Sequence, residues 1–222
     1  MPDVSIRRIG LIDDDPAVRS VYKDAVEDLG LEPVEVEELP DFVSFADKLN
    51  PERDGVICDN QLKSRTYSMV EGNTIVKALY QRKIAALLCT RYWRNDVGIR
   101  QNRRFIPVVL EPKDLGTQLI SGLKICVDEL NGKYLAERKP WKSLVRVEHV
   151  EPLNKETLRL HIVIPGWRPE TGVQIDVSKI DVPSIVAVET TYHAKGVCHA
   201  RAEVNLGANN SDDIYVDQWS VV

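Results

Sequence analysis

The sequence predicts an α/β domain with a doubly wound parallel sheet, followed by a small all-β domain. Between residue 6 and about residue 133, short apolar runs alternate with amphipathic stretches, which is typical of repeated βα units around a parallel sheet. From Trp141 onward the hydrophobic pattern changes to period two, which favours antiparallel strands. The expected domains are residues 1–133 and 141–222, with a polar linker over residues 134–140.

Five βα units can be counted in the first part of the chain. The expected strands are Ile6–Ile12, Glu32–Val36, Gly55–Cys58, Ala85–Cys89 and Ile106–Leu110. The last three are continuously apolar, as buried parallel strands tend to be. The expected helices are Pro16–Leu29, Pro40–Leu49, Thr74–Arg82, Asp96–Arg104 and Leu115–Leu130. In such a sheet ligands bind beyond the carboxyl ends of the strands, so residues that end the strands are candidates for chemistry.

Length and composition limit the class of protein. The 222 residues are enough for two ordinary domains, and a hydrophobic content of 43% allows each a core. The net charge of −5 gives no general attraction to nucleic acid or anionic membranes, and no apolar run approaches the roughly 18 residues of a membrane span. The N-terminus lacks a signal-peptide pattern, and the four cysteines form no Cys-x-x-Cys pair. We therefore expect a cytoplasmic protein with reduced cysteines.

Three successive carboxylates follow the first predicted strand. Asp13, Asp14 and Asp15 precede Pro16, which can open a helix. In the alternative without a metal, Asp15 is the N-cap of the helix and the carboxylates of Asp13 and Asp14 are only solvated. That alternative accounts for one carboxylate of the three. Crowded carboxylates repel one another, however, and a hard cation such as Mg²⁺ with oxygen ligands is the usual relief. We therefore expect a metal site at this turn.

Polar side chains also end two further strands. Asp59 follows the third predicted strand and Thr90 follows the fourth. Because the carboxyl ends of parallel strands meet at one edge of a sheet, these residues should lie close to the acidic turn. A carboxylate beside Mg²⁺ can attack a phosphoryl group while a hydroxyl donates to one of its oxygens. Asp59 would be that nucleophile.

The order of these residues resembles the receiver domain of two-component response regulators (CheY-like) over residues 6 to about 130. That family has an acidic pair after the first strand, a phosphorylated aspartate after the third, Ser or Thr after the fourth and a Lys-Pro step after the fifth. The resemblance implies a flavodoxin-like fold and transfer of phosphate from a histidine kinase or other phosphodonor to Asp59. It further implies Mg²⁺ bound by Asp13, Asp14 and Asp59, Thr90 as the switch hydroxyl, and a shift of the fourth and fifth helices on phosphorylation.

Two positions depart from that pattern. Glu111 precedes Pro112 where the family has lysine, and it would repel a phosphoryl group by on the order of 1 kcal/mol or more. Lys113 lies beyond the proline and could serve as a phosphate partner only if the loop is rebuilt. Arg91 follows Thr90 where a small residue is usual, so it either hinders access or replaces the lysine. The alternative to a working phospho-acceptor is a domain that keeps the fold and interacts without turnover.

Two segments are candidates for partner recognition. The polar stretch over residues 60–72 is longer than the family pattern and could be a recognition loop. Between residues 91 and 104 the chain carries five arginines opposed only by Asp96, namely Arg91, Arg94, Arg100, Arg103 and Arg104. This segment is either a solvated helix face or a surface for an acidic protein partner, with nucleic acid a weaker third choice.

The predicted β domain is expected to bind a protein partner and to form a small barrel or sandwich. From Pro140 on it has eight basic and eleven acidic residues and no helical pattern, which argues against a DNA-binding output. Its four histidines (His149, His161, His193, His199) have a spacing that suits no familiar metal site. Trp141, Trp167 and Trp219 are expected in its core or rim. The oligomeric state stays open, a homodimer included.

Two other functions compete with signalling. The pattern Asp13-x-Asp15 after the first strand resembles the nucleophile and acid of phosphohydrolases of the haloacid-dehalogenase type, with Thr90 as their strand-end hydroxyl. That match is partial because Ala17 stands where Thr or Val is usual, and no later acidic pair completes a metal site. A purely architectural role, with the arginine segment docking a partner, is the third hypothesis. We favour a regulator over a metabolic enzyme.

Overall fold

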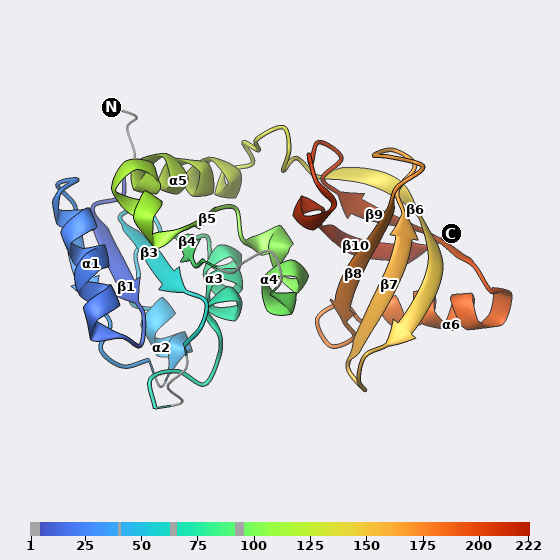
Figure 1. Ribbon diagram of the computed structural model, residues 1–222, viewed down its shortest axis with the longest axis horizontal. Coiled ribbons are helices and arrows are strands. Elements are labelled where there is room, and N and C mark those ends of the chain that lie inside the picture. The colour runs from blue at the N-terminus through green and yellow to red at the C-terminus, as the bar shows by residue number, and fades with distance from the viewer. Residues whose placement is uncertain (1–4, 40, 63–65, 92–95) are drawn as a thin grey trace. The chain divides into compact units, whose positions relative to one another are not determined.

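The computed structural model describes residues 5–39, 41–62, 66–91 and 96–222 (Figure 1). The chain divides into two compact units. The first comprises Met1–Asn95 and Phe105–Lys133, and the second comprises Asp96–Arg104 and Tyr134–Val222. The segment Asp96–Arg104, which sequence patterning assigns to the first domain, therefore groups with the second unit. Residues 134–140, expected as a linker, also group with the second unit, where Arg138 is buried.

The first unit contains a five-stranded sheet in the order β2-β1-β3-β4-β5, and every pairing in it is parallel. The strands are β1 (Arg8–Ile12), β2 (Glu32–Glu35), β3 (Asp54–Asp59), β4 (Ala85–Cys89) and β5 (Val109–Leu110). This confirms the predicted doubly wound parallel sheet. The fifth strand is shorter than expected, since only Val109 and Leu110 pair with β4.

Helices cover both faces of this sheet. They are α1 (Pro16–Glu27), α2 (Phe42–Ala46), α3 (Gly72–Gln81) and α5 (Leu115–Leu130). The core between the sheet and the helices α1 and α5 includes Leu11, Leu87 and Leu119. On the other face Phe45 of α2 lies beside Gly10 of β1. Asp15 caps α1 as predicted, because its Oδ1 accepts a hydrogen bond from the Ala17 amide at 2.8 Å.

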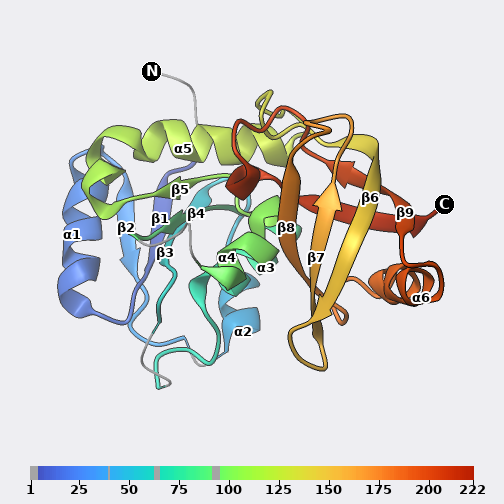
Figure 2. The ribbon, with the colours of Figure 1, turned by 45° about the vertical axis from the view of Figure 1, so that its right-hand side comes forward.

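The second unit is built on an antiparallel five-stranded sheet in the order β10-β9-β6-β7-β8, which curls into a half-barrel (Figure 1). Its strands are β6 (Trp141–Pro152), β7 (Thr157–Val163), β8 (Gly172–Ser178), β9 (Cys198–Val204) and β10 (Val216–Val221), and its helices are α4 (Val97–Gln101) and α6 (Ile185–Lys195). The predicted β architecture is confirmed. Helix α6, which packs against β9, β10 and β6, was not predicted (Figure 2).

The composition of α6 explains why its helical character is hidden in the sequence. Five of its eleven residues are β-branched, and such residues favour strands. They are Ile185, Val186, Val188, Thr190 and Thr191. Tertiary packing decides instead, because Ile185 and Val188 are fully buried in the core of the second unit. The helix ends at Gly196, whose φ of 74° suits glycine.

The predicted core residues are largely in place. All four cysteines are buried and none is in a disulfide. Trp219 lies in the core of the second unit, Trp167 packs at its edge, and Trp141 is exposed. Over the described parts of the chain, no helix has the length and apolar character to cross a membrane.

Candidate functional site

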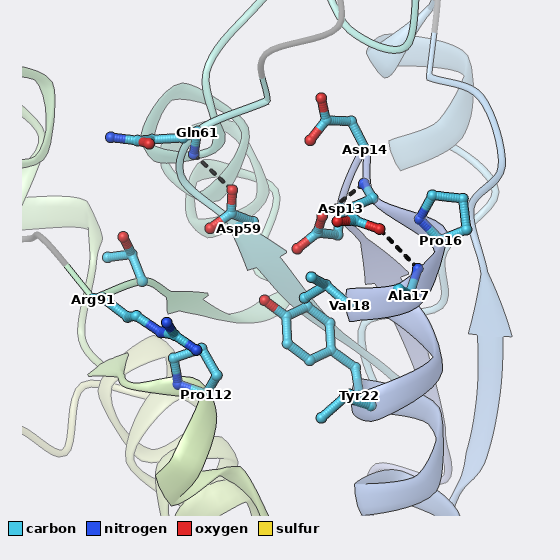
Figure 3. Close-up of a pocket in the computed structure, with 13 residues that line it drawn as sticks. Asp13, Asp14, Pro16, Ala17, Val18, Tyr22, Asp59, Gln61, Arg91 and Pro112 are labelled. Atoms are coloured by element: carbon cyan, nitrogen blue, oxygen red, sulfur yellow. Dashed lines mark hydrogen bonds between the residues drawn. The ribbon is translucent and has the colours of Figure 1, made fainter.

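A pocket of about 730 Å³ opens beside the strand ends of the first unit (Figure 3). The acidic and hydroxyl residues expected at the sheet edge all line it, namely Asp13, Asp14, Asp59 and Thr90. Asp15, Tyr22, Gln61, Arg91 and Pro112 also contribute to its wall. The parallel sheet therefore brings together residues that lie far apart in the sequence, as the strand-end argument predicts.

Asp13 is the most deeply buried carboxylate of the pocket, with 4% of the residue exposed. Its Oδ1 accepts a hydrogen bond from the Asp15 amide at 2.9 Å, and its backbone carbonyl accepts one from Arg19. Burial, with a smaller contribution from the charges of Asp59 and Asp14, raises the pKa of Asp13 to about 6 against the hydrogen bonds that lower it. The pocket thus holds negative charge that a bound cation would relieve.

Asp59 ends β3 on the wall facing Asp13. Its Oδ2 accepts a hydrogen bond from the Gln61 amide at 2.8 Å. Figure 3 shows the carboxylates of Asp13 and Asp59 turned toward the same space, whereas the carboxylate of Asp14 points away from it. Two of the three expected metal ligands are therefore in position, and the third lines the pocket in a different orientation.

The fit of this arrangement to Mg²⁺ follows from its oxygen donors. Carboxylate oxygens suit a hard cation, and Asp13 and Asp59 can supply them from opposite walls of the pocket. Among the residues that the structure describes, no group of three or more His, Cys, Asp or Glu side chains is arranged to hold a metal ion. Asp14 would have to turn inward to complete such a group.

Thr90 and Arg91 stand at the end of β4. Thr90 is buried, and its amide donates to the Leu110 carbonyl at 2.9 Å, which ties the strand end to β5. Arg91 is exposed and lines the pocket. Lys113 does not line it: its Nζ pairs with Glu111 Oε2 at 2.7 Å, its side chain is 73% exposed, and the glutamate raises its pKa. Among the described residues that line the pocket, the cation is therefore Arg91.

Several solved structures that resemble part of this chain are receiver domains. The domain from Methanospirillum hungatei JF-1 is 16% identical and covers 58% of this chain and 98% of its own, with a TM-score of 0.42. The domain from Clostridium thermocellum is 17% identical and covers 57% and 98%, with a TM-score of 0.45. The first unit has a receiver-type fold. No family model and no curated protein matches the sequence.

These identities mean that the likeness concerns the fold alone. It covers the receiver-type unit, and the curled β sheet is a separate region. Within this chain, the observations on the site are the strand order of the sheet and the residues that end its strands.

The start of α3 fixes the segment after Asp59 in the receiver-type unit. The Gly72 amide donates to the Asn60 carbonyl at 3.0 Å, and the Asn73 side chain donates to Asn60 Oδ1 at 2.9 Å. A Cβ atom on Gly72 would lie 1.8 Å from the carbonyl oxygen of Asp59, so only glycine fits there. Sequence reasoning missed this support, although a glycine directly before a predicted helix was a visible signal.

The long loop after Asp59 has a structural part in the receiver-type unit. Tyr67 is buried, and its hydroxyl donates to the Val36 carbonyl at 2.7 Å and accepts from the Asp13 amide at 3.2 Å. Ser68 forms an isolated parallel β-bridge with Leu39 through the backbone. The end of this loop therefore holds the acidic turn in place. Its residues 63–65 lie outside the described residues, and its role as a recognition loop stays a prediction.

Most of the arginine segment makes internal contacts in the second unit. Arg100 donates to the Gln174 carbonyl at 2.8 Å, and Arg103 pairs with Asp213 at 3.3 Å. Arg104 lies over the rings of Tyr134 and Tyr215. These arginines are therefore not a simply solvated face. Arg94, with the neighbouring Tyr92 and Trp93, lies outside the described residues, and a partner surface here stays a prediction.

The haloacid-dehalogenase hypothesis depends on Asp15 as an acid. Asp15 is exposed, and its carboxylate is used to cap α1. The carboxylate turned toward the same space as that of Asp13 belongs to Asp59 (Figure 3). The arrangement therefore favours the receiver-type interpretation.

Proposed function

We propose that this chain is a cytoplasmic signalling protein of the response-regulator kind, which receives a phosphoryl group on Asp59 in a Mg²⁺-dependent reaction. The donor would be a histidine kinase or a small phosphodonor. The observation that supports this proposal is the pair of carboxylates, Asp13 and Asp59, that face one pocket at the end of a receiver-type sheet.

The residues of the pocket suit the chemistry of phosphoryl transfer. An Oδ atom of Asp59 would form a bond to phosphorus while the bond from phosphorus to the donor atom breaks, and the donor leaves with the electron pair. That donor atom is the imidazole nitrogen of a phosphohistidine or the bridging oxygen of a small phosphodonor. The Thr90 hydroxyl would donate to a transferring oxygen, and Arg91 would pair with another. Asp13 and Asp59, with Asp14 turned inward, would hold Mg²⁺, which would neutralise charge on those oxygens.

The second unit would act as an output module that binds a protein partner. From Pro140 on, this unit has eight basic and eleven acidic residues, a balance that does not suit DNA. Within the arginine segment, Arg91 belongs to the receiver-type unit and would contribute to the binding of the phosphoryl group. The described arginines of the segment beyond position 96 support the fold of the second unit.

The test is intact mass after incubation with acetyl phosphate and Mg²⁺. We expect the wild-type protein to gain one labile phosphoryl group, Asp59→Asn to gain none, and a chelator to prevent the gain. Asp24→Asn, which changes an exposed carboxylate on α1 outside the pocket lining, is the matched control and should react like the wild type. Absence of an adduct in the wild type overturns the phospho-acceptor role.

A receiver that interacts without turnover is the second candidate. It is favoured by Lys113, which is held in an exposed ion pair and contributes no charge to the pocket lining. If acetyl phosphate gives no adduct and Mg²⁺ leaves the melting temperature unchanged, this second candidate replaces the first.

A further inference from the structure

Tyr22 places a phenol hydroxyl at the acidic pocket from a helix that carries no expected site residue. It lies on α1 with 1% of the residue exposed, and its ring belongs to the apolar core beneath the sheet. Figure 3 shows its hydroxyl directed into the space that the carboxylates of Asp13 and Asp59 also face. A buried phenol usually has a polar partner, and here these are the Asp13 carboxylate and the Cys89 thiol.

No lysine is found in the described lining of the pocket, since Lys113 is paired with Glu111 outside it. The cation in that described lining, Arg91, sits at an exposed position. The described lining of the pocket therefore presents the carboxylates of Asp13 and Asp59, the buried Thr90 hydroxyl and the Tyr22 phenol on its inner side. A phosphoryl group on Asp59 would bring further negative charge to that side, and its oxygens would need donors.

The Tyr22 hydroxyl is suited to donate rather than to ionise. A phenol ordinarily has a pKa of about 10, so it keeps its proton at neutral pH. A neutral donor buried next to an anion forms a strong hydrogen bond, because water does not compete for either group.

We propose that the Tyr22 hydroxyl binds the phosphoryl group carried by Asp59, as a neutral hydrogen-bond donor on the side of the pocket where the described lining holds no lysine. The inference rests on the proposed function. In the resting protein the same hydroxyl faces Asp13, and it turns its hydrogen bond to a phosphoryl oxygen when the group arrives. No proton is transferred, so the residue acts through binding.

The test compares Tyr22→Phe with Tyr80→Phe. Both changes remove one phenol oxygen and keep the ring, and the Tyr80 hydroxyl bonds to Glu129 away from the pocket. The measurements are the rate of phosphoryl uptake from acetyl phosphate and the dissociation constant for beryllofluoride with Mg²⁺. We expect Tyr22→Phe to lower the uptake rate and to raise the dissociation constant, each by about tenfold or more, as for a lost hydrogen bond to a charged group. Equal values for the two variants overturn the proposal.

Two controls separate this result from other failures. If the wild type itself neither takes up phosphoryl nor binds beryllofluoride, the proposed function has failed, and the role of Tyr22 in it fails too. If Tyr22→Phe does not fold, the ¹³Cζ resonance of Tyr22 in the labelled wild-type protein replaces it. We expect that resonance to shift when beryllofluoride is added to the protein already saturated with Mg²⁺. A resonance that does not change on this addition contradicts the proposal.

Discussion

The pocket around Asp13 and the cluster around Arg138 both bury charged side chains, and the two differ in how that charge is satisfied. Arg138 is 4% exposed and donates to the carbonyl of Arg104 at 3.0 Å, with its guanidinium over the ring of Tyr215. Asp13 is equally buried, but its nearest charged neighbours in the pocket include Asp59 and Asp14, which carry the same sign. The Arg138 guanidinium meets carbonyl oxygens and a ring face, whereas the Asp13 carboxylate lies near charges of its own sign.

This difference separates a structural cluster from a candidate binding site. A buried cation whose donors meet carbonyls and ring faces stabilises the fold and leaves little to offer a ligand. A buried carboxylate among like charges stays costly until a cation or a proton arrives. Substitutions in the two regions should therefore change stability in opposite directions.

The largest effect is expected for Arg138→Met in the second unit. Methionine fills much of the same space but leaves the carbonyls of Arg103 and Arg104 without this donor, and it removes the contact with Tyr215. We expect the free energy of unfolding to fall by about 4 kcal/mol. Denaturant unfolding followed by circular dichroism measures it.

Arg146→Met is the matched control for that experiment. Arg146 lies in the same unit, but its guanidinium is exposed and pairs with Glu148 on the surface. Its loss should cost less than about 1 kcal/mol. Equal losses for the two variants would mean that the buried arginine is no more important to the fold than a surface one.

The second effect has the opposite sign. Asp13→Asn keeps the acceptor for the Asp15 amide and removes the charge, so we expect the protein to become more stable by about 2 kcal/mol at pH 7. The pKa of Asp13 rises from 3.8 to about 6 on folding, so between these values the folded state binds more protons than the unfolded state. Stability contributed by this group therefore falls as the pH rises from about 4 to about 6.

Thermal or denaturant unfolding at pH 4 and pH 7 checks both parts of this prediction. The gain from Asp13→Asn should be present at pH 7 and nearly absent at pH 4, where the wild-type carboxyl is protonated. Asp24→Asn, an exposed change on the same helix region, should show neither gain nor pH dependence beyond about 0.5 kcal/mol. If the Asp13→Asn variant is less stable than the wild type at pH 7, the negative charge of Asp13 does not destabilise the folded protein, and this account of the pocket is wrong.

The acidic pocket could be predicted from the sequence because a parallel sheet fixes where its strands end. Once the apolar runs are recognised as strands, Asp13, Asp59 and Thr90 must meet at one edge. The direction in which Asp14 turns could not be predicted, because it depends on the backbone of one turn. Only the structure shows that the hydroxyl of Tyr22 reaches the pocket while its ring stays in the core.

The second unit was harder to predict because long-range packing decides it. Alternating residues indicated its antiparallel strands, but the β-branched residues of α6 concealed a helix. The buried position of Arg138 in a segment that looks like a linker depends on Tyr215, 77 residues further along the chain. A pattern read over a short window contains no information about such a partner.

The smallest effect is expected at Lys113, and it decides which cation serves the pocket. Lys113→Ala breaks an exposed ion pair with Glu111, so the free energy of unfolding should change by less than about 1 kcal/mol. Because Lys113 does not line the pocket, phosphoryl uptake from acetyl phosphate should stay within about twofold of the wild type. Arg91→Ala, which removes the cation that does line it, should slow uptake by about tenfold. If Lys113→Ala slows uptake as much as Arg91→Ala does, the loop after β5 must rearrange during the reaction and bring the lysine to Asp59.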